Sequence, residues 1–85
     1  MEYYLGQIEL FAINFQPSGW IPCDGRLMDV RYNQALFALL GNRFGGDGIN
    51  NFAVPDLRTS MFGSQYYMKI IYYICTNGIW PQRDM

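Results

Sequence analysis

Few side chains of this chain could take part in chemistry. Seven residues are acidic, histidine is absent, and cysteine occurs only at Cys23 and Cys75. Without histidine, neither a Ser–His–Asp nor a Cys–His arrangement can be assembled. Asp24, Asp47 and Asp56 each stand beside a turn signal, so we expect them to accept hydrogen bonds from their own turns rather than form a catalytic carboxylate dyad. The sequence therefore predicts a protein that is not an enzyme.

The segment from Phe44 to Arg58 carries the best candidates for ligand binding. Its glycines could form a backbone nest for an anion, but a tight turn that needs positive φ is the simpler interpretation. Asp47, Asp56 and Arg58 could line a pocket for a small anion, a nucleotide or a sugar. For Arg58 a structural role comes first, in which it pairs with Asp56 or Asp47 and locks the loop. The residues singled out here as turn formers are Gly45, Gly46, Gly48 and Pro55.

No metal or cofactor is predicted. The spacing from Asp47 to Asn51 misses the calcium-loop pattern, and two cysteines are too few for a closed zinc site. Cys23 and Cys75 could form a disulfide, but the N-terminus lacks an export signal, which favours two buried free thiols.

Length and composition point to a small domain that assembles with others. The chain has 85 residues, is 51% hydrophobic and 18% aromatic, and carries a net charge of −1, so we expect one domain over residues 1–85. A domain of this size buries only roughly 60–65% of its unfolded surface, and its surplus aromatic residues favour an oligomer interface. The basic residues are scattered, which argues against nucleic acid, and no apolar run is long enough to span a membrane. Because no export signal is found, we expect the chain to be made in the cytoplasm and either to stay there or to leave in a preassembled particle.

The first third of the sequence predicts short strands. Residues 7–12 alternate, with Ile8, Leu10 and Ala12 on one face. Residues 20–23, starting at Trp20, are short and apolar, and the Asp24-Gly25 dipeptide suits a tight turn. We expect residues 26–28 to return as the second arm of a hairpin, with Pro22 placing the first arm at an edge or a bulge.

One helix and one long strand are expected in the remainder. Residues 33–40 carry an apolar stripe and end at Gly41, a suitable C-cap, while Asp29 is a start signal. Residues 66–76 are apolar on both faces, so both faces should be covered, and one short helix leaves the second face for another subunit. Trp80 should serve as a last aromatic anchor. The residues expected at such an interface are Tyr66, Met68, Ile70, Tyr72 and Trp80.

The polar segment at 44–58 is expected to be an ordered loop rather than a mobile one. Its apolar residues, spaced among glycines and asparagines, would pin it to the core. These residues are Phe44, Phe52, Val54 and Leu57.

Several blocks of the sequence, in this order, resemble the phage tail collar domain family, which is also seen in microcystin-dependent proteins. The blocks are Gly6-Gln7-Ile8, Gly19-Trp20, Cys23-Asp24-Gly25-Arg26-Leu27, Asn33 through Gly41, and Phe44-Gly45-Gly46-Asp47-Gly48 through Val54-Pro55-Asp56-Leu57-Arg58. The sequence departs from the family after Arg58, where members carry a long glycine-rich insertion, often with a histidine pair. Only residues 59–65 stand in its place here.

The resemblance implies an α+β fold, a small, mostly-β domain with one short helix packed on a few strands and long ordered loops. It also implies a structural module of a phage tail or of a phage-derived particle such as a contractile injection system. Such a module would form a homo-oligomer, expected to be a trimer, and would contact other tail, baseplate or fibre proteins. The lost insertion puts host-receptor binding in doubt. The alternative is a soluble module that binds a small ligand through the Gly46 to Arg58 loop.

Overall fold

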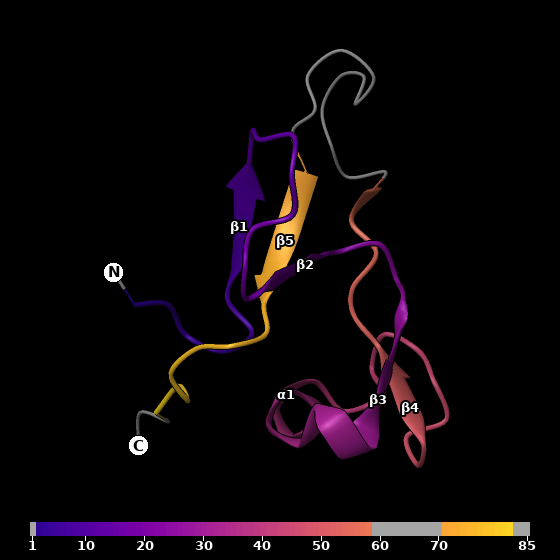
Figure 1. Cartoon of the computed structure of the whole chain (residues 1–85). Helices are drawn as coiled ribbons and strands as arrows, with labels where there is room; N and C mark the ends of the chain where they lie inside the picture. Colours follow the sequence, from indigo (N-terminus) through magenta and orange to yellow (C-terminus); the bar gives the residue numbers. More distant parts are fainter. Residues whose placement is uncertain (1, 59–70, 83–85) are drawn as a thin grey trace.

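The fold consists of two antiparallel sheets. They are joined by a two-stranded antiparallel ribbon, formed by residues 23–30 and 50–57. The computed structural model describes residues 2–58 and 71–82. A three-stranded sheet has the order β1-β5-β2 and is formed by β1 (Ile8–Phe11), β2 (Trp20–Pro22) and β5 (Ile71–Cys75). A two-stranded sheet is formed by β3 (Leu27–Asp29) and β4 (Asn51–Ala53), beside the 3-10 helix η1 (Val30–Tyr32) and the helix α1 (Gln34–Leu40). Figure 1 shows the two sheets as separate groups. The prediction of a small, mostly-β α+β fold is confirmed.

The ribbon that joins the sheets pairs residues 23–30 with residues 50–57. Leu27 lies opposite Ala53 in the β3–β4 pair, and the same register continues outward to a bridge between Asp24 and Asp56. Beyond the bridge, the Leu57 N–H donates to the Cys23 carbonyl at 2.8 Å. The Cys23 N–H in turn donates to a carbonyl of β5 at 2.9 Å. The ribbon therefore starts at the three-stranded sheet, and its far part is the two-stranded β3–β4 sheet.

This pairing contradicts the predicted hairpin between residues 20–23 and 26–28. β2 pairs with β5, and β3 pairs with β4. The chain does not fold back at Asp24-Gly25. The Gly25 N–H donates instead to the Pro55 carbonyl at 3.2 Å, so this segment continues beside the later one although Gly25 has a φ of 77°. The expectation that Pro22 lies at a sheet edge is confirmed, since β2 is an edge strand.

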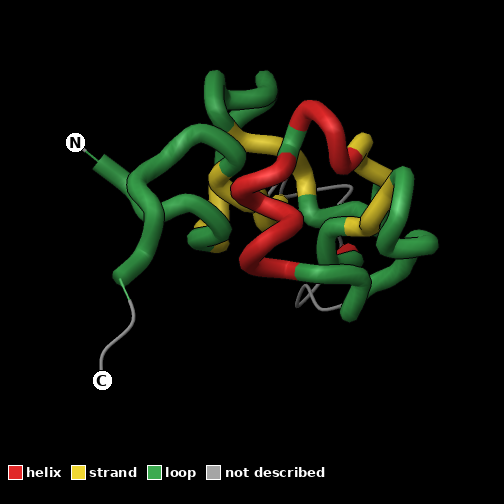
Figure 2. The backbone as a smooth tube through the Cα atoms, turned by 90° about the horizontal axis from the view of Figure 1, so that it is seen from below, coloured by secondary structure: helices red, strands yellow, loops and turns green. Residues whose placement is uncertain are grey.

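The main core lies between the two sheets and is closed by α1. Its buried residues come from the N-terminal segment, both sheets and the helix: Leu5, Cys23, Leu36, Leu40, Phe52, Val54 and Ile74. Phe52, Val54 and Ile74 are fully buried. Seen from below in Figure 2, the helical segment crosses in front of the strands. A helix of seven residues has no stability alone, so α1 depends on this packing.

The boundaries of α1 follow the sequence signals closely. Asp29 caps η1 by accepting from the Arg31 N–H at 2.8 Å, and α1 follows directly after Asn33. Gly41 ends α1 with φ at 60°, and its N–H donates to the Phe37 carbonyl at 2.7 Å. The predicted helix and its glycine end are confirmed. The expected start signal is not: Asp29 caps η1, and Asn33 precedes α1 without a side-chain cap bond.

A second, aromatic cluster covers the other face of β5. Trp20, Tyr73 and Cys75 are buried there, and Phe11 packs edge-to-face on Trp20 and Tyr73 at ring-centroid distances of 5.0 and 5.2 Å. Tyr3 packs on Trp20 in the same way at 5.1 Å. Both faces of β5 are thus covered, as predicted, but over residues 71–75 the cover comes from this chain. Tyr72, the predicted interface residue within β5, lies on the opposite face of the strand and packs on the main core of this chain. The predicted contact with a second subunit stays a prediction.

Two predicted anchors and one predicted loop differ from the structure. Phe44 is 46% exposed, because Gly45 turns the chain and the Phe44 ring stacks under the Arg43 guanidinium instead of entering the core. Trp80 is 49% exposed and anchors nothing in the described core. The segment 44–58 is ordered, as expected, but it contains the strand β4, which the polar sequence did not indicate. In the described ranges no helix is long and apolar enough to cross a membrane.

Phe52 and Phe44 provide a matched test of the core. Phe52→Ala should lower the free energy of unfolding by about 3–5 kcal/mol, because it leaves a cavity between the two sheets. Phe44→Ala should change it by less than about 0.5 kcal/mol, because the ring already meets solvent. Urea denaturation followed by tryptophan fluorescence measures both. Equal losses would show that the assignment of core and surface is wrong.

Candidate functional site

The charged groups of the structure are organised as three Asp-x-Arg forks with the same local geometry. Asp24 accepts from the Arg26 N–H at 3.2 Å, from Nε at 3.0 Å and from the terminal guanidinium nitrogen at 3.0 Å. Asp56 accepts the same three bonds from Arg58, at 3.2, 2.9 and 2.7 Å. A third fork joins residues 29 and 31. Each carboxylate therefore accepts one bond from the backbone N–H of its arginine and two bonds from the guanidinium of the same residue.

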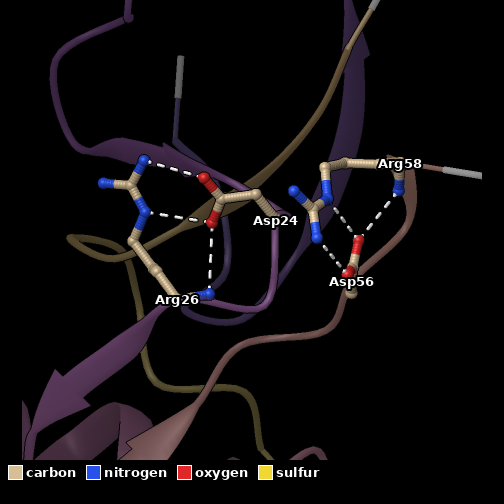
Figure 3. A network of polar contacts seen from close by, with 4 residues as sticks. All are labelled: Asp24, Arg26, Asp56 and Arg58. Carbon is tan, nitrogen blue, oxygen red and sulfur yellow. Dashed lines mark hydrogen bonds and ion pairs between the residues drawn. The ribbon is translucent and has the colours of Figure 1, made fainter.

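Two of these forks lie side by side on the ribbon. Asp24 and Asp56 form the bridge between its two strands, and Figure 3 shows both forks at this place. Gly25 allows the approach: its φ is 77°, and a Cβ atom there would lie 3.2 Å from the Asp56 Cβ. Arg26 and Arg58 thus brace the point at which the ribbon leaves the three-stranded sheet. We infer a structural role for this site.

The forks shift the acid–base properties of their carboxylates. The hydrogen bonds from Arg58 lower the pKa of Asp56 from 3.8 to about 2, and those from Arg26 lower the pKa of Asp24. Burial, reinforced by the Asp24 charge, raises the pKa of the Cys23 thiol to about 11. That thiol stays protonated at neutral pH, which removes its nucleophilic character. Cys23 and Cys75 are both buried and free, as predicted.

Asp47 organises a different turn, at the other end of the β3–β4 pair. Its Oδ1 accepts from the N–H groups of Ile49, Asn50 and Asn51 at 2.8, 2.8 and 3.0 Å. Its own N–H donates to the Asn51 Oδ1 at 2.9 Å. These three bonds lower its pKa. The carboxylate serves its own turn, as the simpler interpretation of the sequence predicts.

The glycines beside Asp47 supply positive φ and close approach. Gly45, Gly46 and Gly48 have φ of 137°, 90° and 73°. A Cβ atom at Gly46 would lie 2.6 Å from the Phe52 Cα. The loop therefore lies directly against β4 and leads the chain into the buried position of Phe52.

The residues predicted to bind a ligand are not gathered at one place. Asp47 bonds to Asn51 beyond one end of β4, whereas Asp56 and Arg58 lie beyond its other end, at the bridge to Asp24. Of the predicted trio the structure brings together only Asp56 and Arg58. Among residues 2–58 and 71–82, no three Cys, Asp or Glu side chains gather as a metal site would require.

The predicted interface residues fall into three groups. Trp80 is half exposed beside Tyr4 and Ile79. Tyr72 is half buried and packs on the main core. Tyr66, Met68 and Ile70 lie outside the described residues.

The pairing of Asp24 with Arg26 and of Asp29 with Arg31 was not predicted. The signal for it is present in the sequence, because Asp-x-Arg occurs three times, at residues 24, 29 and 56. A short carboxylate two residues before an arginine can bond both the backbone N–H and the guanidinium. The third pair, Asp56 with Arg58, was one of the alternatives considered.

These features define the class of protein: a small β-rich structural domain whose polar groups mainly brace its own loops. A comparison with family models assigns residues 6–62 to the Phage Tail Collar Domain. Since the match covers more than half of the chain, the chain belongs to the phage tail collar domain family. Neither the curated proteins nor the solved structures that were compared with it contain a significant match.

Gly46 and Gly41 test the close approach of the loop. Gly46→Ala should destabilise the protein more than Gly41→Ala, because a Cβ at Gly46 meets the backbone of β4 and one at Gly41 meets nothing within 4 Å. Both glycines have positive φ, so both variants carry backbone strain, and only Gly46→Ala adds a steric clash. Thermal denaturation compares their midpoints. A larger loss at Gly41 would contradict the assigned packing.

The three forks and the Asp47 turn together predict that the protein loses stability in acid. The pKa values of Asp24, Asp29, Asp47 and Asp56 are all lowered by folding. A lowered pKa contributes stability above the unfolded value and loses it as pH falls. The thermal denaturation midpoint should therefore decrease as the pH is lowered from about 4 to about 2. Asp56→Asn should flatten this dependence, whereas an unchanged profile would show that the fork contributes nothing.

Proposed function

We propose that the chain is an oligomeric assembly module of a phage tail or of a phage-derived particle such as a contractile injection system. Membership of the collar family implies a structural tail module that assembles with other tail proteins. The finer proposal is that copies of the chain associate, as a trimer, and attach a tail fibre or tip. The module is made in the cytoplasm and functions in the tail, where it can also take part in host attachment.

The observation that carries this proposal is an apolar patch beside the two ends of the described chain. Tyr4, Ile79 and Trp80 are 55%, 45% and 49% exposed. A parallel bridge joins Tyr4 to Ile79, and bonds of 2.8 Å run from the Leu5 N–H to the Ile79 carbonyl and from the Ile79 N–H to the Tyr3 carbonyl. Figure 1 shows the first and last segments side by side. Large aromatic side chains held on a fixed backbone are typical of interface centres.

The alternative, a ligand pocket in the Gly46 to Arg58 loop, finds no support in the geometry. The Asp47 carboxylate is bonded to its own turn and the Asp56 carboxylate to Arg58. The two lie at opposite ends of β4, so they do not converge on a common ligand. The role of this loop as a structural link is therefore the better interpretation.

Trp80 and Tyr32 test the patch. Sedimentation of the full chain at micromolar concentration should show a trimer. Trp80→Ala should shift it toward the monomer while the monomer keeps its fold, because the ring anchors nothing in the described core. Tyr32→Ala, at a residue that is 79% exposed elsewhere, should leave the trimer intact. A clean monomer for the unaltered protein would overturn the proposed oligomer.

A further inference from the structure

Within residues 2–58 and 71–82, no strand pairs with the outer edge of β1. We propose that this edge accepts an extended strand of another protein, one with a basic residue between two apolar residues. The inference rests on the proposed role in assembly and adds the chemistry of the partner. It concerns a surface on the three-stranded sheet that is separate from the patch around Trp80.

The hydrogen bonds between β1 and β5 determine which groups face outward. The Cys75 N–H donates to the Gln7 carbonyl at 2.8 Å. In an antiparallel pair, every second residue bonds to the neighbouring strand, so the register carries this pattern on to Glu9. The N–H and C=O groups of Ile8 and Leu10 must therefore point away from β5. Neither residue is bonded elsewhere within the described chain.

The other neighbour of β5 gives the same answer independently. The Tyr72 carbonyl accepts from the Cys23 N–H, and the Thr76 N–H donates to the Gly19 carbonyl. The backbone groups of the even-numbered residues of β5 therefore bond to β2, and those of the odd-numbered residues bond to β1. In Figure 1 no described segment lies along the outer side of β1.

The side chains at this edge are also suited to a partner. Ile8 is 37% exposed and Leu10 is 40% exposed. Between them on the opposite face, the exposed Glu9 carboxylate accepts from the Gln7 side chain at 2.7 Å and has no cationic partner among the described residues. Residues 8–11 contain neither lysine nor proline, which usually protect an edge strand. A strand that pairs with this edge would contact the side chains of Ile8 and Leu10 on one face and the Glu9 carboxylate on the other.

A second copy of this chain fits this edge poorly. The antiparallel register that pairs Ile8 with Leu10 of another β1 sets the two Glu9 carboxylates opposite each other, in the pair where side chains approach most closely. Pairing β1 with β2 of another copy meets Pro22, which has no N–H to donate. The charge of Glu9 instead favours a foreign strand that places lysine or arginine opposite it.

The test is an NMR titration of the full chain with capped five-residue peptides that have a valine–lysine–valine centre. The expected result is saturable shifts at Ile8, Glu9 and Leu10. A glutamate-centred peptide should bind about two- to fivefold more weakly, and a peptide N-methylated at both valines should not bind. Glu9→Lys should reverse the preference between lysine and glutamate. Equal binding of all three peptides, or shifts centred away from β1, would overturn the proposal.

Leu10→Pro separates edge pairing from simple apolar contact. It removes an outward N–H and no bond to β5, so the fold should persist while binding is lost; Leu10→Ala keeps the N–H and should bind with a modest loss. If both variants bind alike, the edge is not the site. Sedimentation of the same samples distinguishes the two proposals, since a monomer that still binds the peptide contradicts only the proposed trimer. Dimerisation of Glu9→Gln would show that a second copy occupies this edge.

Discussion

The antiparallel ribbon of residues 23–30 and 50–57 is the constraint on which the rest of the structure depends. It leaves β5 at Cys23, crosses the bridge between Asp24 and Asp56, and becomes the β3–β4 pair in one unbroken register. Because it is continuous, it places Phe52 and Val54 opposite Ile74 and the helix in one core. Gly25, the Asp47 turn and the Asp-x-Arg forks all lie at points where this ribbon bends or ends.

Local features of the fold were predictable from the sequence, and its long-range pairing was not. The α1 helix has a strong apolar stripe and a glycine end, and the turn at Asp47 depends only on neighbouring residues. The partner of β3 could not be foreseen, because β4 is three residues long and lies in a segment rich in glycine and asparagine. An Asp-Gly dipeptide also favours a hairpin, whereas here residues 23–25 pair with residues 55–57 of a distant segment.

The candidate site was predictable in its parts and not in its arrangement. That Asp47 would serve its own turn and that Arg58 would pair with Asp56 follow from short-range spacing. That these groups lie at opposite ends of β4 depends on the tertiary pairing. In the described residues the charges mainly brace the chain's own loops, while exposed apolar side chains such as Trp80 and the outer edge of β1 face outward. The proposed role in assembly rests on these outward-facing groups.

Native-state amide hydrogen exchange tests the central claim most directly, because it reports local opening residue by residue. If the ribbon joins both sheets into one cooperative unit, the amides of Val54 and Leu57, which bond across the ribbon, should exchange only with global unfolding. The amide of Cys75, which bonds within the three-stranded sheet, should show the same opening free energy. A lower value at Val54 and Leu57 would mean that the β3–β4 half opens alone, which would contradict the account.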